Sequence, residues 1–271
     1  MAAVCVVLVG PSAPGGALIA EAPALPAGAA TGIVPGRVLT WNICNPCGRA
    51  GHNLGRAAEI AAYAPQVFGL QEACVRDVEE IREYLEKYYG LVYDVAYGTV
   101  LRKWSRCGGL PWRPGAYGQA ILSAGPVSGR VLVEYPDGGT EDRGYLAVTT
   151  EVGGRPVRVF NTHLAERRQP EVRAGQVRVL APAVARYDRA IVLGDFNAVP
   201  DAPELAPMWA LATDADPACR PASHGGTCET TTDWRSKFDY VFLRGLTARD
   251  HRVRSSAFSD HDSLRADVRT R

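Results

Sequence analysis

The chain lacks the signatures of several common classes of enzyme and of membrane protein. It has no run of about 18 to 20 consecutive apolar residues, so the sequence predicts no transmembrane helix. It contains neither the GxxxxGKS loop that binds nucleotide phosphates nor the GxSxG turn that presents a nucleophilic serine. The net charge of +1 does not point to a polyanionic partner, although a local basic rim can exist on a neutral protein.

A second CxxC pair is also missing. A zinc ribbon needs two such pairs, and the chain has only CNPC at 44–47, so structural disulfides are favoured over a zinc site. After residue 36 the number of cysteines is even, which indicates an oxidising compartment. Many pairings are open, and the short loop between the last two cysteines makes theirs the simplest. The cysteines concerned are Cys44, Cys47, Cys74, Cys107, Cys219 and Cys228.

The first 36 residues have little charge, with Glu21 as their one charged side chain. The apolar run VCVVLVG at 4–10 and the small residues AGAA at 27–30 are typical of a signal peptide, but its basic start is missing. Residues 1–36 are interpreted as a signal peptide that starts upstream or as a disordered Ala/Pro-rich leader, with a low-complexity tail on a cytosolic enzyme as the alternative. We expect a secreted protein with one domain over residues 37–271.

The rest of the chain alternates short apolar strands with a few helices. Helical spacing predicts helices at 54–65, 75–90 and 171–187, and a short one near 203–211. A stretch rich in Gly, Pro and Trp predicts a long loop at 98–118. Strands are predicted at 36–44, 66–72, 91–97, 119–123, 129–135, 144–152, 155–164, 189–194, 237–245, 250–256 and 263–270. This order suits two packed sheets flanked by helices in one domain.

Polar residues collect where these strands end. If the strands share one sheet edge, acids, amides and imidazoles from distant parts of the chain converge there. Each residue alone has an ordinary explanation: Asn161 caps turns well, and a lone histidine such as His163 is usually structural. The joint occurrence at matching strand ends favours a site. Its members are Asn42, Glu72, Asn161, His163, Asp195, Asn197, Asp239, Asp260 and His261, while His52, His224 and His251 are expected at the surface.

The residue types in this group indicate metal-assisted hydrolysis of a phosphate ester. The oxygen ligands of Asn42, Glu72 and Asp260 suit Mg²⁺, with Mn²⁺ or Ca²⁺ as alternatives. Histidines beside acids can donate to a phosphate or move protons. No thiol or serine nucleophile is offered, so direct attack by water assisted by a metal is the simplest chemistry.

Seven segments, taken together and in order, resemble the endonuclease/exonuclease/phosphatase superfamily, which includes DNase I. They are TWNI at 40–43, LQE at 70–72, GQAILS at 118–123, NTHL at 161–164, GDFN at 194–197, FDYVF at 238–242 and SDHDSL at 259–264. The resemblance spans residues 37–271. It implies an α/β fold, a four-layer αββα sandwich of the DNase I type, with the site at one edge of two facing sheets.

The resemblance also implies roles for the site residues. Glu72 holds the metal, with Asn42 beside it or on the phosphate, and Asp260 contributes to the metal site. Asp195 orients or deprotonates the attacking water, and Asn197 binds a phosphate oxygen. His261, oriented by Asp239, and His163 contact the phosphate. Arg143 in EDRGYLAV is a candidate phosphate contact, and Gln119 stands where many members have Asn, which places it outside the first rank.

Within this superfamily, a secreted monomeric nuclease is the first expectation. Basic residues at 102, 103, 106 and 113, with Trp104 and Trp112 between them, suit a nucleic-acid backbone and stacked bases. The same tryptophans suit a membrane interface, so a sphingomyelinase-like enzyme acting on lipid head groups is the runner-up. An inositol-phosphate phosphatase comes third. A non-catalytic binding or toxin-like module is the alternative outside enzymes.

Overall fold

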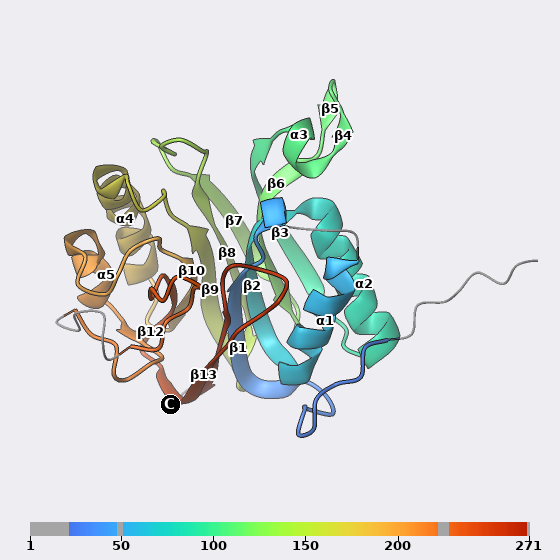
Figure 1. Cartoon of the computed structure of the whole chain (residues 1–271). Coiled ribbons are helices and arrows are strands. Elements are labelled where there is room, and N and C mark those ends of the chain that lie inside the picture. Colours follow the sequence, from blue (N-terminus) through green and yellow to red (C-terminus); the bar gives the residue numbers. More distant parts are fainter. Residues whose placement is uncertain (1–21, 48–50, 222–227, 270–271) are drawn as a thin grey trace, which may run out of the picture.

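Two six-stranded sheets face each other and helices cover their outer faces (Figure 1). The computed structural model describes residues 22–47, 51–221 and 228–269. The expected α/β four-layer sandwich is confirmed. The apolar run at 4–10, the remainder of the leader up to residue 21, and His224 lie outside the described residues.

The first sheet has the strand order β13-β14-β1-β2-β6-β3. Strands β1 and β2 run parallel, and the other neighbours are antiparallel. The strands are β1 (Val34–Asn42), β2 (Pro65–Cys74), β3 (Asp94–Arg102), β6 (Ala116–Ser123), β13 (Thr247–Arg254) and β14 (Ser263–Arg269).

The second sheet has the order β11-β12-β10-β9-β8-β7, with β9 and β10 parallel. Its strands are β7 (Ser128–Glu134), β8 (Gly144–Val152), β9 (Arg155–His163), β10 (Ala190–Asp195), β11 (Thr213–Asp214) and β12 (Asp239–Arg244). The predicted hairpin between β8 and β9 is present, with Gly153 and Gly154 at positive φ in its turn.

Each sheet buries its outer face under helices that are apolar on one side. The outer helices of the first sheet are α1 (His52–Tyr63) and α2 (Val75–Tyr89), and those of the second are α4 (Pro170–Ala185) and α5 (Ala206–Trp209). Helix α2 buries Val78, Ile81 and Leu85, which share one face, and ends before Gly90 in the left-handed conformation. Burying each such side chain stabilises the fold by about 1.5–3 kcal/mol. Short 3-10 turns lie at Asn45–Cys47 and Pro203–Leu205.

Asn161 joins the two sheets through the middle of the apolar core. Its amide nitrogen on β9 donates to the carbonyl oxygens of Leu70 at 2.9 Å and Ala120 at 2.8 Å in the other sheet. Its amide oxygen accepts from Gln71 Nε2 at 2.6 Å. A Cβ at Gly69 would lie 2.9 Å from the Asn161 side chain, so glycine makes room for it. The turn-capping explanation for Asn161 is therefore wrong.

The predicted loop 98–118 is wrong at both ends. Strand β3 continues to Arg102 and β6 starts at Ala116. Gly98 lies within β3 and Gly118 within β6. Glycine is needed at 118 because a Cβ there would lie 1.9 Å from the Gly98 carbonyl oxygen. Between them, residues 103–115 form an arm that stands away from the body (Figure 1). The arm contains α3 (Trp104–Cys107) and the two-residue strands β4 (Gly109–Leu110) and β5 (Arg113–Pro114).

Three disulfides fasten loops at the edges of the sandwich. They join Cys44 to Cys47, Cys74 to Cys107, and Cys219 to Cys228, so the simplest predicted pairing is confirmed. The CNPC segment closes on itself and offers no free thiolate for zinc.

Part of the predicted leader belongs to the folded unit. Strand β1 begins at Val34, and Leu25, Ala30 and Ile33 pack against the core under α1 and α2. The boundary at residue 37 stays a prediction. In the described part of the chain, no helix is long and apolar enough to cross a membrane.

Candidate active site

Three adjacent strands of the second sheet place acids and a histidine in one row. Asp195 at the end of β10 pairs in register with His163 at the end of β9 on one side. On its other side it pairs with Asp239 at the start of β12. A Cβ at Gly194 would lie 2.2 Å from the Thr162 carbonyl oxygen, so glycine permits this close packing. The polar residues that follow buried strands therefore meet because the strands end at one level.

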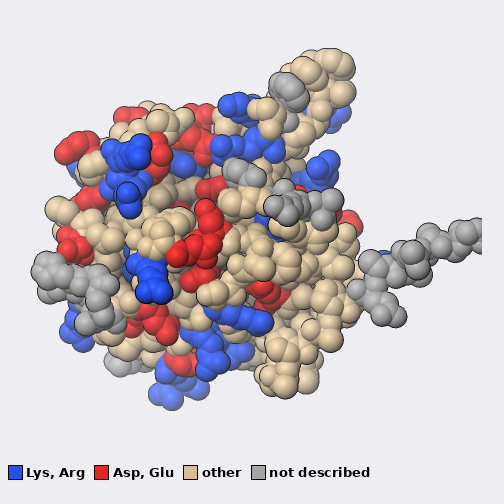
Figure 2. Space-filling view, in the orientation of Figure 1, with Lys and Arg blue, Asp and Glu red and all other residues tan. Residues whose placement is uncertain are grey.

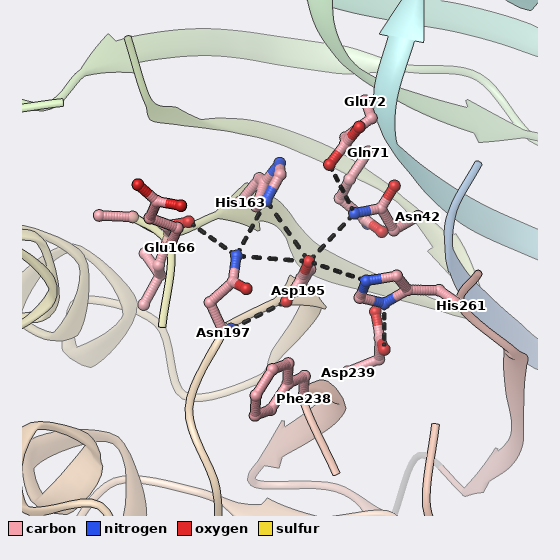
Figure 3. A network of polar contacts seen from close by, with 12 residues as sticks. Asn42, Gln71, Glu72, His163, Glu166, Asp195, Asn197, Phe238, Asp239 and His261 are labelled. Atoms are coloured by element: carbon pink, nitrogen blue, oxygen red, sulfur yellow. Dashed lines mark hydrogen bonds and ion pairs between the residues drawn. The ribbon is translucent and has the colours of Figure 1, made fainter. Parts of the chain in front are cut away.

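The facing sheet brings Asn42 and Glu72 to the same edge. Asn42 ends β1 opposite Gln71 of β2. The pairing of β2 with β6 shifts register between Leu70 and Ala73, and Glu72 in that bulge has a left-handed backbone with φ 52°. Asn42 Nδ2 donates to Glu72 Oε1 at 3.2 Å, so the bulge directs the glutamate toward the site (Figure 3).

Asp195 is the centre of the polar network (Figure 3). Its Oδ2 lies 3.0 Å from Asn42 Nδ2, 3.4 Å from His163 Nε2, 3.5 Å from Asn197 Nδ2 and 3.7 Å from His261 Nε2. Its Oδ1 accepts from the backbone N–H of Asn197 at 2.8 Å. Burial raises the pKa of Asp195 to about 7, against the opposing effect of the His261 charge. Nitrogen groups from four side chains thus converge on one small volume.

His261 is held as a cation. Its Nδ1 lies 2.8 Å from Asp239 Oδ2. Burial lowers the pKa of His261, but the carboxylates of Asp239 and Asp195 outweigh burial and raise it to about 10. Trp234 packs its ring edge-on against the imidazole, with ring centroids 5.4 Å apart. His261 therefore presents a positively charged Nε2–H group toward Asp195.

His163 has the opposite electrostatic setting. Burial and the Arg143 guanidinium lower its pKa well below the usual value. Arg143 NH1 lies 3.1 Å from His163 Nδ1 and 2.6 Å from Glu141 Oε2. The ring is also 3.1 Å from Asn197 Nδ2 through its Nε2. The two histidines thus face one point in different protonation states.

The carboxylate of Glu72 fits a divalent metal. Burial raises its pKa, and its one hydrogen-bond donor among the described residues is the neutral amide of Asn42. A bound cation would strongly stabilise the ionised form of such a buried carboxylate, and oxygen ligands suit Mg²⁺. The Asn42 amide oxygen accepts from the Cys44 N–H at 2.9 Å, so a metal would share that oxygen with the backbone. Both ligand roles stay predictions.

A second buried group has ligand atoms within 4.8 Å of one another: Asp195, Asp239 and His261. The hydrogen bond between the last two already uses Nδ1 and a carboxylate oxygen, an arrangement that orients the ring. Asp260 is half-buried, with its carboxylate within 4.8 Å of the bonded sulfurs of Cys44 and Cys47. Its part in a metal site stays a prediction.

Gln119 is absent from this network. It is buried in the core, where its Nε2 donates to the Gly144 carbonyl oxygen at 3.0 Å. Two residues were missed from sequence: Trp234 against His261, and Glu141 on Arg143. Glu141 stands two residues before Arg143 and Trp234 five before Asp239, yet neither spacing follows a pattern that would single them out.

A cavity of about 630 Å³ opens beside Asn197. Trp234, Ser236 and Phe238 line it on one side, and residues 166–168 on the other. Its volume is in the usual range for pockets that hold small ligands.

Solved structures of other proteins share this fold. A TDP2 of D. rerio in complex with a single strand DNA product is 18% identical, with TM-score 0.68 over 86% of this chain and 98% of that one. The catalytic domain of human Nocturnin with a bound sulfate is 24% identical, with TM-score 0.64 over 87% and 93%. An endonuclease/exonuclease/phosphatase from Beutenbergia cavernae is 25% identical, with TM-score 0.64 over 86% and 71%.

No curated protein sequence matches the chain. The sequence profile of the Endonuclease/Exonuclease/phosphatase family matches residues 39–261, which contain every candidate site residue. Because this match covers most of the chain and agrees with the fold, the chain belongs to the endonuclease/exonuclease/phosphatase family and is one of its metal-dependent phosphoesterases.

Proposed function

We propose that the protein is a secreted, Mg²⁺-dependent nuclease that cleaves phosphodiester bonds by direct attack of water. One observation carries the proposal: nitrogen donors of Asn42, His163, Asn197 and His261 converge on Asp195 beside the carboxylate of Glu72. A phosphate placed among these donors would meet charge-complementary groups on several sides. When bound, Mg²⁺ would polarise a phosphate oxygen and neutralise charge that develops on it.

The site residues would supply the proton transfers, the stabilisation of charge and the binding of metal and phosphate. Asp195, with a pKa of about 7, accepts a proton from water when it is ionised. His261 is protonated at neutral pH and stabilises the extra negative charge on phosphorus or protonates the leaving oxygen. His163 is neutral and donates a hydrogen bond. Glu72 and Asn42 would hold the metal, and Asn197 would bind a nonbridging oxygen.

A nucleic-acid substrate is supported by what surrounds the site. The cavity beside Asn197 has an exposed tryptophan, Trp234, on which an unpaired base can stack. Arg167 and Arg168 on its other side are exposed and form no hydrogen bond or ion pair with other described residues. Figure 2 shows acidic side chains near the middle of this face, with Lys and Arg around them. The D. rerio TDP2 in complex with a single strand DNA product has the same fold.

A phospholipid substrate is the second candidate, and the arm favours it. Trp112 is 79% exposed and Leu110 is 49% exposed at the arm's tip, with Lys103 and Arg113 exposed below. An apolar tip above basic residues suits the interface of an anionic membrane. Secretion is supported by the three disulfides, which persist in oxidising compartments.

A substrate panel with two matched variants tests the proposal. Purified protein is given single-stranded DNA, RNA, sphingomyelin vesicles and inositol phosphates, each with Mg²⁺, with Mn²⁺ or Ca²⁺ in its place, and with excess chelator. We expect cleavage of oligonucleotides that chelator abolishes. Trp234→Ala should raise KM for oligonucleotides, and Trp112→Ala should leave it nearly unchanged. Hydrolysis of vesicles that Trp112→Ala abolishes, without hydrolysis of oligonucleotides, would establish the second candidate instead.

A further inference from the structure

A chain of charged side chains runs from the arm to His163. Arg106 on α3 forms an ion pair with Glu141 Oε1. The other oxygen of Glu141 lies 2.6 Å from Arg143 NH1. The same NH1 lies 3.1 Å from Nδ1 of His163, whose Nε2 lies 3.4 Å from Asp195 Oδ2. The contacts therefore connect the arm, through Glu141, Arg143 and His163, to the proposed general base Asp195.

The contact with Arg143 determines where the proton of His163 sits. A guanidinium has only donor groups and keeps its charge in proteins, so Nδ1 of His163 must accept. The neutral ring then carries its proton on Nε2, which lies 3.4 Å from Asp195 Oδ2. Asn197 Nδ2 is 3.1 Å from the same nitrogen, but its two hydrogens have other acceptors: the Leu164 carbonyl oxygen at 3.1 Å and Asp195 Oδ2 at 3.5 Å. A phosphate oxygen at this point would meet an N–H donor. The opposite tautomer would present a lone pair and repel it.

Arg143 depends on Glu141 for its place. Both are mostly buried, with side chains 9% and 14% exposed, and Glu141 divides its two oxygens between Arg143 and Arg106. Arg106 also lies over the ring of Tyr117, 4.6 Å from its centroid. The next residue, Cys107, is bonded to the end of β2. The arm is thus fixed at two points and braces the carboxylate.

We propose that Glu141 is a positioning residue: braced by Arg106, it holds Arg143 on Nδ1 of His163 and keeps the imidazole proton on Nε2. The part of this proposal that concerns the reaction rests on the proposed phosphodiester cleavage. The proton position does not, because it follows from the hydrogen bonds of the protein alone.

A variant without the charge of Glu141 distinguishes the positioning role from two alternatives, repulsion of the substrate and binding of the metal. A carboxylate that merely stands near a phosphate repels the substrate, so its removal would raise kcat/KM. A carboxylate that binds the metal would be replaced in part by a higher Mg²⁺ concentration. Loss of a positioning residue lowers kcat at every Mg²⁺ concentration, since the donor itself is misplaced.

The first experiment measures kcat and KM for Glu141→Gln and Arg106→Met on the best substrate of the panel. The control is Glu134→Gln, which removes an exposed carboxylate on β7 that has no side-chain partner among the described residues. We expect Glu141→Gln to lower kcat about tenfold or more without raising KM, and without rescue by Mg²⁺. Arg106→Met should give a smaller loss and the control none. A rise in kcat/KM, or rescue by Mg²⁺, overturns the proposal.

The second experiment needs no turnover. Long-range ¹H–¹⁵N spectra of the histidine rings report which nitrogen carries the proton, and His163→Gln identifies the signals of His163. We expect an unprotonated Nδ1 in the wild type and in Glu134→Gln, and a shift toward protonated Nδ1 in Glu141→Gln. A wild-type ring protonated on Nδ1, or a ring unaffected by Glu141→Gln, overturns the proposal. If the spectra behave as expected but no phosphodiester is cleaved, the proposed function fails and the positioning stands.

Discussion

The Asp239→Asn variant gives the sharpest test of how the site uses charge. Asn keeps the size of Asp and still accepts from His261 Nδ1, but it removes the negative charge 2.8 Å away. Two charges with centres about 4 Å apart interact by about 4 kcal/mol at an effective dielectric constant near 20. That energy corresponds to about three pKa units. The pKa of His261, about 10 in the wild type, should therefore fall to about 7 in the variant.

The expected pH profile follows from the signs of the two shifts. In the wild type, kcat/KM rises as Asp195 loses its proton near pH 7, and it falls only as His261 loses its proton near pH 10. In Asp239→Asn the fall moves to about pH 7, so only about 3% of His261 is protonated at about pH 8.5 and the rate drops about thirtyfold there. The rise also moves to lower pH, because Asp239 helps to raise the pKa of Asp195.

The assay is kcat/KM on bis(p-nitrophenyl) phosphate or an oligonucleotide between about pH 5 and 9.5 at saturating Mg²⁺. The control is Asp250→Asn, which removes a half-exposed carboxylate on β13 that pairs with Arg265 and leaves His261 alone. Circular dichroism checks that both variants fold. A kcat/KM profile of Asp239→Asn that stays flat up to about pH 9.5 would refute the electrostatic reasoning. The Asp239 carboxylate would then serve only to orient the His261 ring.

The remaining predictions concern the metal, the histidines and the disulfides. Glu72→Gln should lose activity mainly through weaker metal binding, so a higher Mg²⁺ concentration should restore part of its rate. Asp195→Asn should not be rescued by Mg²⁺, and equal rescue of both variants would contradict their roles. His163→Ala and His261→Ala should each lose about a hundredfold or more in kcat, and the double variant less than the product of the two losses; near-normal turnover in either would make that histidine structural. The oxidised protein should weigh about six mass units less than the reduced one, since three disulfides each remove two hydrogens, and six free thiols in the native protein would exclude them.

Sequence reasoning identified the row of His163, Asp195 and Asp239 because strand ends are marked by the change from apolar to polar residues. Parallel and antiparallel pairing then aligns such ends without further information. Two packed sheets flanked by helices followed from the same alternation, and the family resemblance implied the four-layer αββα sandwich. The contacts of Trp234 and Glu141 could not be predicted in this way. Both lie in turns whose course depends on long-range packing, and no local period marks them.

The glycines and Asn161 show a second limit. Glycine predicts a turn when only the local backbone is considered, yet Gly98 and Gly118 allow two strands to pass closely. Asn161 is polar and follows an apolar run, so it resembles a site residue in sequence. In the fold its amide satisfies backbone groups of the facing sheet. Such cases depend on which atoms lie opposite, and the sequence does not record that.

The three disulfides lie in loops or at a strand end and none joins two strands of a sheet, so their reduction should affect activity more than the stability of the fold. Two of them lie next to strand ends that carry site residues, because Cys44 follows Asn42 and Cys74 follows Glu72. The third closes a loop between β11 and β12, in the segment before Asp239. The sheets themselves are held by apolar burial that reduction does not change. In a reducing cytosol the sandwich should persist while these loops loosen. Under the proposed secretion, the cell that makes the enzyme would be protected from its activity until the disulfides form. Activity and circular dichroism, each measured with and without a reductant, test this consequence.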